Sequence, residues 1–497
     1  MANFLASLLS SIARANDALN GIIWGLPTLA LIMGVGVVMS FGTGFFQFRH
    51  MFHVLDSTII SALRRRAKAE TVAGGKSISQ LQAVSGALAA TIGTGNIAGV
   101  ATAIMMGGPG AILWMWVSAI LGMMTIYSEN VLGIYYRKKN DAGEWAGGPM
   151  YYIEEGLSEM RGFRRIARPL AMAFALCCTL ASFGIGNMTQ VNTISTTLQS
   201  SFAIPPAVSG VLLAIAAQFV LIGGISRIGA VAEKMVPFMA GGYVLLTVII
   251  LFSNYKEIPH IFSSIIGNAF GVNAITGGIS GVMVKQAMTM GFKRGVFSNE
   301  AGMGSSVIIS CASDVKEPAV QGMWGIFQVF VDTIVICSLT AFALLSTDVI
   351  GKIGPGGVPI QGAPLVAEAF STVFGDAAGG LLAVAVLFFA FATVIGWSYF
   401  GEKSVEYLLG SRAVMPYKII FVLFIVVGAL LEMELVWDIS DTLNGLMAIP
   451  NLIALLLMAK MVMKITDNYS RRKFGGEKSL KPMLSAYDSG QEQSKDV

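Results

Sequence analysis

The sequence predicts an all-α integral membrane protein with about eleven transmembrane helices, ten of them in two inverted sets of five. Three observations carry this prediction. Of 497 residues, 55% are hydrophobic and only 12% are charged, with a mean hydropathy of +0.70, whereas soluble domains carry about 25% charged residues. Eleven apolar segments are long enough to cross a bilayer. Two of these segments, five apart, are interrupted by glycine and polar residues.

The eleven apolar segments have the length of about 20 residues that spans a bilayer. They are residues 23–46, 83–106, 110–135, 167–189, 206–225, 229–252, 278–311, 320–345, 379–401, 416–432 and 438–462. Lys and Arg are richer in alternate loops, beginning with the loop after the first segment, and cytoplasmic loops collect these residues. The alternation predicts an N-terminus outside the cell and a C-terminus in the cytoplasm. Residues 1–20 predict a short amphipathic helix rather than a cleaved signal peptide.

The first interruption lies in the uncharged stretch Leu81–Gly108, which reads Gly-Thr-Gly-Asn-Ile-Ala-Gly from Gly93 to Gly99. Each glycine costs about 1 kcal/mol relative to alanine inside a helix, and backbone groups freed in lipid must find other partners. One explanation is a ligand, because half-helix ends present amides to a carboxylate and carbonyls to a cation. The other is a small-residue face for helix packing. The stretch alone leaves both open.

The second interruption lies between Ile275 and Ser310, where Phe297–Gly304 again mixes small and polar residues. The stretch also contains Lys285, Lys293, Arg294 and Glu300. A charge at the bilayer centre costs at least about 2.5–3.5 kcal/mol on insertion scales, so it faces a cavity or a partner. We therefore expect a second broken helix here.

Broken helices in corresponding places of two halves are typical of inverted-repeat transporters. We expect an N-terminal part at 1–80, with an amphipathic helix, the first span and a basic loop. Two five-helix repeats follow at 81–275 and 276–463. A polar cytoplasmic tail occupies 464–497.

Other polar residues in the spans have two interpretations each. Asn187 and Gln190 close the fourth segment, either as an interface cap or as part of a site. Thr393 and Trp397 share a helix face, because they are four residues apart; tryptophan in a span more often serves packing. Further charged residues are interpreted as structural or gating: Glu129, Glu233, Lys234, Asp332 and Glu402. No phosphate-binding loop of the Walker type occurs, which argues against ATP as the driving force.

Several motifs resemble the alanine or glycine:cation symporter family, also called sodium:alanine symporters. They are Gly107–Gly122 (GGPGAILWMWVSAILG), Gly93–Gly99, Gly147–Leu157 (GGPMYYIEEGL) and Gly295–Ser306 (GVFSNEAGMGSS). The resemblance spans residues 20 to 465. It implies the amino acid–polyamine–organocation superfamily and a leucine-transporter-like fold with one added N-terminal helix.

The resemblance also implies a substrate site at the two interruptions. The amides around Gly93, Thr94 and Gly95 would receive a carboxylate, and Asn96 would either steady the unwound turn or offer its side-chain oxygen. From the second interruption, Phe297, Ser298, Asn299, Gly302 and Met303 would face the amine and the side chain. The pocket would be completed by Gln190, Thr393 and Trp397.

A cation site is implied between the first and eighth core helices. Its ligands would be the carbonyls of Ala89, Ile92 and Ala390 and the hydroxyl of Thr393. Some relatives of the fold have a serine directly after this threonine, whereas Val394 stands here. The coupling ion implied is Na⁺, with H⁺ as the alternative, and no organic cofactor is expected.

Taken together, these features predict a non-enzymatic secondary active transporter that takes up a small neutral amino acid, such as alanine or glycine, by alternating access. The alternative substrate is a larger neutral amino acid such as glutamine. A channel would show ion flux without saturable exchange. A substrate sensor would need a large cytoplasmic output domain, and the short polar tail argues against that interpretation. We expect a bacterial or archaeal plasma membrane location, contact with lipid, and neither a nucleic-acid partner nor an obligate protein partner.

Overall fold

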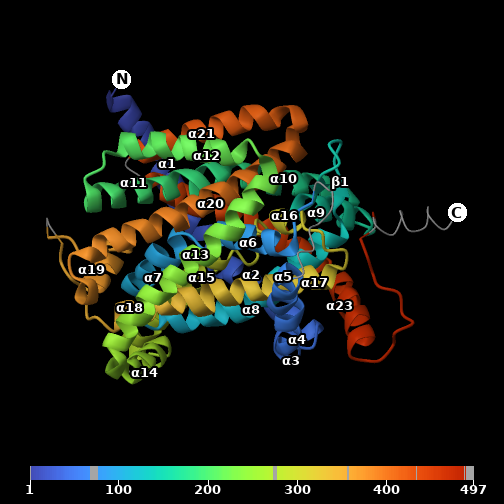
Figure 1. Ribbon diagram of the computed structural model, residues 1–497, viewed down its shortest axis with the longest axis horizontal. Coiled ribbons are helices and arrows are strands. Elements are labelled where there is room, and N and C mark those ends of the chain that lie inside the picture. Colours follow the sequence, from blue (N-terminus) through green and yellow to red (C-terminus); the bar gives the residue numbers. More distant parts are fainter. Residues whose placement is uncertain are drawn as a thin grey trace.

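The computed structural model describes residues 2–67, 77–271, 277–354, 357–431, 434–485 and 487. Three sequence predictions fall partly outside these residues: the first basic loop, of which 68–76 are not described, the repeat boundary at 275–276, and the end of the polar tail. The described chain is almost entirely helical, and its helices run along the long axis of the molecule (Figure 1).

The N-terminal part precedes the first interrupted helix. It forms α1 (Ala2–Ile23), α2 (Leu26–Gly42), α3 (Phe46–Arg49), α4 (Met51–Leu55), the π-helix η1 (Asp56–Ile60) and α5 (Ser61–Ala67). The next part corresponds to the first predicted repeat. It contains α6 (Gln80–Thr91), η2 (Gly95–Gly99), α7 (Val100–Gly107), α8 (Ala111–Tyr135), the hairpin β1 (Lys138–Lys139) and β2 (Trp145–Ala146), α9 (Pro149–Ser158), α10 (Arg164–Phe183), η3 (Gly184–Met188), α11 (Thr189–Phe202), α12 (Pro206–Leu221), α13 (Gly224–Ser253), η4 (Tyr255–Glu257) and α14 (Ile258–Ala269).

The second predicted repeat starts with the other interrupted helix. It contains α15 (Gly277–Asn299), α16 (Val307–Ser310), α17 (Pro318–Val329), η5 (Phe330–Cys337), α18 (Ser338–Leu345), α19 (Gly362–Phe374), α20 (Ala377–Leu409), η6 (Ser411–Ala413), α21 (Val414–Leu430) and α22 (Glu434–Leu457). The last helix is α23 (Ala459–Lys473).

All eleven predicted segments are helical. Within the described residues, seven helical segments are long and apolar enough to cross a membrane, and nine if two bent pairs each count as one span. The bent pairs are α1 with α2, and α6 with η2 and α7. The other two segments correspond to α12, which is short and apolar, and to α15, which carries three cations.

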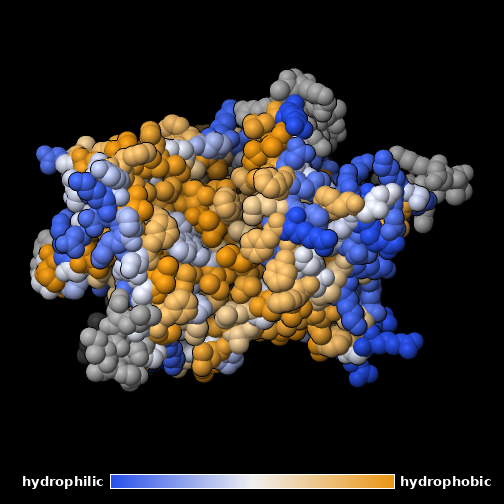
Figure 2. Space-filling model, turned by 90° about the horizontal axis from the view of Figure 1, so that it is seen from below, coloured by the Kyte–Doolittle hydropathy of each residue, from blue (hydrophilic) through white to orange (hydrophobic). Residues whose placement is uncertain are grey.

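On the face shown in Figure 2, apolar side chains cover the middle, and hydrophilic side chains gather toward the two ends. Exposed residues of the central helices are large and apolar, for example Phe219, Leu245 and Phe252. Such a band is what a surface in contact with lipid acyl chains requires, because no water there can solvate polar groups. The pattern agrees with helices that cross a membrane along the long axis.

Corresponding helices of the two predicted repeats make matching contacts. In the first repeat, α8 and α12 are the second and fourth helices, and they pack against their counterparts α17 and α21. The contact of α13 with α20 is matched by the contact of α22 with α10. Swapping each helix for its counterpart therefore reproduces the same pairs, as an internal repeat requires.

Both interrupted helices have local causes. A capping box starts α6, in which Ser79 and Gln82 bond each other's backbone amides, and the helix stops at Thr91, before Ile92 and Gly93 leave helical geometry. The pair α6 and α7 is bent by 51° at this break. The second helix, α15, ends at Asn299; after it Glu300, Gly302 and Gly304 have φ values of +59°, +88° and +75°, a region that favours glycine.

Candidate functional site

The two interruptions meet inside the molecule. A Cβ atom added to Gly95 would lie 3.2 Å from Cδ1 of Phe297 and 3.5 Å from Cα of Ser298. The absence of a side chain at Gly95 thus lets the first break approach the backbone of the second. The sequence predicts two broken helices at one site, and the structure brings them together.

Asn96 joins the breaks by hydrogen bonds. Its Oδ1 accepts from the Gly93 amide at 2.9 Å, which steadies the unwound turn. Its Nδ2 donates to Ser298 Oγ at 3.0 Å and to Asp332 Oδ1 at 2.7 Å. Asn96, Ser298 and Asp332 are all fully buried. Since buried polar groups need partners, this network fixes the relative position of the two breaks.

Asp332 is a candidate functional residue that lies outside the predicted site, because the sequence analysis groups it with structural or gating charges. It lies on the π-helix η5, and its carboxylate also accepts from Ser298 Oγ at 2.7 Å and Thr333 Oγ1 at 2.9 Å. All of these donors are neutral. A carboxylate buried among neutral donors at membrane depth is a mark of an ion or proton pathway. The one sequence signal was an acidic residue inside a predicted span.

Gln190 and Thr393 lie on the other side of the first break. A Cβ atom on Gly93 would lie 2.5 Å from Thr393 Oγ1 and 3.4 Å from Gln190 Oε1. The Thr94 amide faces Gln190 Oε1 at 3.4 Å. The Thr94 hydroxyl is buried and has no hydrogen-bond partner among the described residues. Of the predicted residues from distant helices, these two therefore do gather at the break.

The predicted cation ligands lie where α6 packs against α20. Thr393 Oγ1 donates to the Ala89 carbonyl at 3.2 Å and to Phe389 O at 3.1 Å. Ile92 caps the C-terminus of α6, and Ala390 is fully buried one residue after Phe389. Carbonyl and hydroxyl oxygens are hard ligands, the type that suits a small hard cation. The Thr393 hydroxyl and the Ala89 carbonyl thus place two oxygen ligands from different helices side by side next to the first break.

Trp397 is buried like Thr393 and contacts the second break. Its Nε1 donates to Glu300 Oε1 at 3.0 Å, and its side chain fills the space beside Gly186, where an added Cβ would lie 2.3 Å from Trp397 Cβ. Glu300 Oε2 accepts from Ser305 Oγ at 2.5 Å. Trp397 thus holds Glu300, the residue with positive φ at the break. The sequence interpretation recognised the charge of Glu300 but not this partner.

The remaining predicted residues of the second break make contacts within the break and with neighbouring helices. Asn299 donates to Thr333 Oγ1 at 3.0 Å and accepts from the Ala301 amide. Gly302 packs against Leu452 of α22, and its carbonyl accepts from Asn451 at 2.9 Å. Met303 is buried in the apolar core. These three shape the break in the observed conformation.

One end of the molecule is open above the breaks. A cavity of about 740 Å³ is lined by α7, α11, α15, α22 and the start of α19, and Phe297 and Trp437 are among its lining residues. We call it the vestibule. The opposite end is closed: Ile78 pairs with Ser313 in a parallel bridge, and Arg137 donates to the carbonyls of Cys311 at 3.0 Å and Ser313 at 2.7 Å. Among the described residues, the site is therefore open toward the vestibule, whereas these contacts hold elements together at the opposite end.

Known proteins match this chain over most of its length. A protein-family model described as "Sodium:alanine symporter family" matches residues 9–482. The "Sodium/alanine symporter AgcS" of Methanococcus maripaludis is 43% identical over 454 residues, which cover 91% of this chain and 96% of that protein. The "Probable sodium/glutamine symporter GlnT" of Bacillus subtilis is 35% identical over 460 residues, covering 92% and 91%.

A solved structure supports the fold. The crystal structure of MhsT in complex with L-phenylalanine aligns with a TM-score of 0.53 at 14% identity, over 79% of this chain and 99% of that chain. The interrupted helices, the paired repeats and this alignment agree on the leucine-transporter-like fold with an added N-terminal helix. With the family model matched over residues 9–482, the chain belongs to the sodium:alanine symporter family.

Proposed function

We propose that this protein takes up a small neutral amino acid such as alanine or glycine together with Na⁺, by alternating access. The observation that carries the proposal is the meeting of two Gly-rich helix breaks, with Gly95 against Phe297 and Asn96 bonded to Ser298. Half-helix ends at such a point present amides and carbonyls to a zwitterion and a cation. The matched family and the name of the AgcS relative support the same substrate class.

The substrate carboxylate is proposed to bind at Thr94 and Gly95. The Gly93 amide already donates to Asn96, whereas the Thr94 amide has only a long contact of 3.4 Å to Gln190 and the Thr94 hydroxyl has no partner among the described residues. A carboxylate needs charge-assisted hydrogen bonds to offset its desolvation. Thr94 therefore offers the donors that a bound substrate would use.

Na⁺ is proposed as the coupling ion, with Ala89, Ile92, Ala390 and Thr393 as ligands. The contact of Thr393 Oγ1 with Ala89 O supports this set, because it brings two oxygen ligands from different helices together. Asp332 adds a negative charge beside both breaks and stabilises a cation, either Na⁺ or H⁺. A cation bound at these positions would hold α6 and α20 together, so cation binding would affect the conformation of the substrate site.

The open vestibule and the closed opposite end support alternating access. We propose that the vestibule faces the outside, with the N-terminus outside and the C-terminus in the cytoplasm of a bacterial or archaeal cell. The orientation rests on the Lys and Arg alternation in the loops. The observed conformation would then be the one that receives substrate.

The test is uptake of radiolabelled alanine by the purified protein in liposomes, with and without an inward Na⁺ gradient. We expect saturable uptake that the gradient stimulates and that glycine inhibits. Stronger inhibition by glutamine than by glycine would favour the substrate class in the name of the GlnT relative. Uptake that an inward H⁺ gradient drives without Na⁺ would reject Na⁺ as the coupling ion. Ion flux without saturable uptake would reject the transporter.

A further inference from the structure

The segment that follows α2 runs across the molecule. It comprises α3, α4, η1 and α5, residues 46–67, and we call it the crossing segment. In Figure 1 it lies near α17 and α23 and runs across the direction of α8 and α17, which follow the long axis. Since the spanning helices cross the membrane along this axis, the crossing segment lies along the membrane surface.

One face of the crossing segment packs on the protein, and the next face is apolar but exposed. Val54 and Thr58 are 3% and 0% exposed, and α4 and η1 contact α17. The exposed large apolar side chains of the helix from α4 to α5 include Phe52, Leu55, Ile60 and Leu63. Phe52 is 90% exposed. The protein itself therefore leaves this apolar stripe uncovered.

The π-helix η1 keeps the stripe on one face. Side chains three or four residues apart are neighbours on an α-helix, so Phe52 lies beside Leu55, and Ile60 beside Leu63. The step from Leu55 to Ile60 is five residues, which is one turn of a π-helix. An unbroken α-helix would turn Ile60 by about 140° from Leu55. The extra residue in η1 thus aligns the two halves of the stripe.

Positive charge borders the apolar stripe. The crossing segment contains four arginines and one aspartate, and α5 ends with three of these arginines before Ala67. Asp56 pairs with Arg64 at 3.4 Å, and both side chains are exposed. Helices with an apolar face and a basic edge lie in the membrane interface, where they are attracted to anionic lipids. The crossing segment has this composition and this orientation.

A cavity of about 430 Å³ lies at the start of the crossing segment, between the turn after α2 and α23. Arg49 and His50 line it from one side, and Asp467 and Arg471 from the other. Arg471 is paired, with Asp467 at 3.7 Å and with Glu477 at 2.6 Å. The Arg49 side chain is exposed and has neither a hydrogen bond nor an ion pair among the described residues. The charge of Arg49 is therefore available to an anion from outside the protein.

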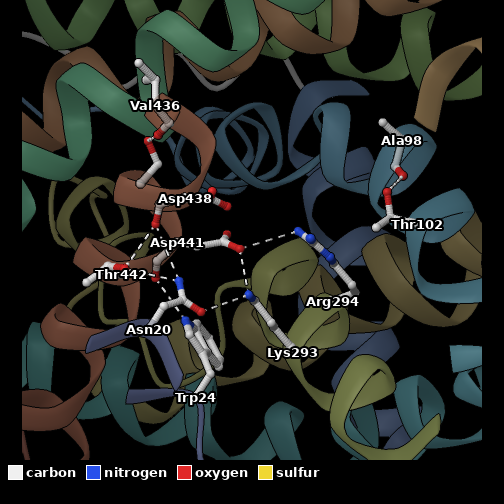
Figure 3. Close-up of polar contacts among 11 residues, drawn as sticks. Asn20, Trp24, Ala98, Thr102, Lys293, Arg294, Val436, Asp438, Asp441 and Thr442 are labelled. Carbon is white, nitrogen blue, oxygen red and sulfur yellow. Dashed lines mark hydrogen bonds and ion pairs between the residues drawn. The ribbon is translucent and has the colours of Figure 1, made fainter. Parts of the chain in front are cut away.

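The cations of the vestibule wall differ from Arg49, because they are paired with a carboxylate. Lys293 Nζ lies 2.8 Å from Asp441 Oδ2, and Arg294 Nη1 lies 3.9 Å from the same oxygen. Figure 3 shows both cations facing Asp441, whose carbonyl accepts from Trp24 Nε1 at 2.9 Å. Arg49 thus combines an unpaired charge with a cavity, which the cluster around Asp441 does not.

We propose that the cavity and the crossing segment bind a phospholipid with a net negative head group, such as phosphatidylglycerol. The lipid phosphate binds the Arg49 guanidinium, because charge-assisted hydrogen bonds between these groups are strong. The acyl chains lie along the exposed rings of Phe41, Phe45 and Phe48, which flank the cavity-lining residues in the sequence. A free phosphate ion would use the guanidinium only and leave the apolar surface uncovered, so the phospholipid fits both features.

The first test measures lipid binding to the purified full-length protein in a neutral detergent. Its melting temperature is followed during titration with short-chain phosphatidylglycerol, with phosphatidylcholine of the same chain length, or with inorganic phosphate. A ligand that binds only the folded protein raises the melting temperature. We expect phosphatidylglycerol to raise it more than phosphatidylcholine does, and inorganic phosphate to leave it unchanged.

Arg49→Gln tests the cavity itself. This change should raise the phosphatidylglycerol concentration that gives half of the shift about tenfold or more, as expected for the loss of one charge-assisted hydrogen bond. The control Arg412→Gln removes an equal charge from an exposed position in η6 and should leave the titration unchanged. The melting temperature without lipid verifies that both variants are folded.

The second test measures the placement of the crossing segment in liposomes that contain phosphatidylglycerol. Spin labels are attached to Leu63→Cys on the apolar stripe and to Arg64→Cys on its charged border, both of which are exposed positions of α5. We expect oxygen, which concentrates among acyl chains, to relax the label at position 63 more strongly. A water-soluble nickel chelate should relax the label at position 64 more strongly. Protein without either change gives the background from native cysteines.

Each contrary outcome overturns a stated part of the proposal. Equal shifts with the two lipids would reject recognition of a negative head group, and an equal shift with inorganic phosphate would indicate a site for a free anion. An unchanged titration after Arg49→Gln would reject the cavity as the binding site. Labels that are both accessible only to the chelate would reject the placement in the membrane. None of these measurements uses an amino acid, so their failure leaves the proposed transport function standing.

Discussion

At the scale of single residues, the site depends on two glycines, whose lack of a side chain lets other helices approach the first break. Gly93 and Gly95 let the first break touch Thr393 on one side and Phe297 on the other. The sequence pattern predicts the break itself, because closely spaced glycines are unfavourable inside a helix. The pattern does not predict which helix would fill each gap, since that depends on the packing of segments about 200 to 300 residues away.

Substituting Gly95 with valine tests the break directly. Its Cβ would meet Phe297 at 3.2 Å, and overpacking costs about 1–3 kcal/mol, so alanine affinity should fall about fivefold to a hundredfold. Equilibrium binding of labelled alanine measures this. Gly241→Val is the matched control, because nothing lies within 4 Å of an added Cβ in that position of α13. Equal affinity in the two variants would favour the packing-face interpretation of the Leu81–Gly108 stretch.

Trp397 illustrates a role that helix periodicity cannot reveal. The change to Phe removes the Nε1 donor and leaves Glu300 Oε1 buried without it. An unsatisfied buried acceptor costs about 1–3 kcal/mol, so the melting temperature in detergent and the uptake rate should both fall. The family resemblance also implies that Trp397 lines the substrate pocket. This role is tested separately: after Trp397→Ala, larger amino acids should inhibit alanine uptake more strongly. A melting temperature equal to that of the unmodified protein would contradict the role of Trp397 in holding Glu300.

At the scale of elements, the interrupted helices were predictable and their connection was not. Broken segments five spans apart predicted the repeat, and the structure has breaks at η2 and after α15. The carboxylate that links them lies on η5, a π-helix within a span that has no glycine-rich break. A π-helix is often found at a functional site, but hydropathy is the same for π- and α-helices. The sequence therefore indicated Asp332 only as a charge in a span.

Replacing Asp332 with asparagine tests whether the charge matters for coupling. The shape is nearly unchanged, but the negative charge that stabilises a cation is lost. We expect the Na⁺ concentration for half-maximal uptake to rise about tenfold or more, as expected for the loss of about 1.5–3 kcal/mol from a charged interaction. Asp376→Asn, at the exposed start of α20, is the control. The same Na⁺ dependence in both variants would assign Asp332 a purely structural role.

At the scale of the whole molecule, the length and number of the apolar segments predict much of the architecture, while the orientation inferred from loop charge stays a prediction. The eleven segments are all helical, and counterpart helices pack in matching pairs. The lateral packing of α1 against α22, reinforced by the bond from Trp24, directly after α1, to the Asp441 carbonyl, could not be predicted, because helix propensity does not encode which face of the bundle a helix covers. The same limit explains why the partners of Lys293 and Arg294 emerged only from the structure.

The orientation of the bundle gives the last prediction. Helices α11 and α23 lie toward opposite ends of the long axis (Figure 1), and the Lys and Arg distribution assigns the α11 end to the outside. Cysteines introduced as Ser201→Cys and Ser479→Cys are therefore expected on different sides of the membrane. In intact cells an impermeant maleimide should label the first, and the second only after permeabilisation. The native cysteines are buried or half-buried, so unmodified protein provides the background. Labelling of both positions in intact cells would exclude the eleven-span topology, because in it spans five to eleven, an odd number, separate position 201 from position 479.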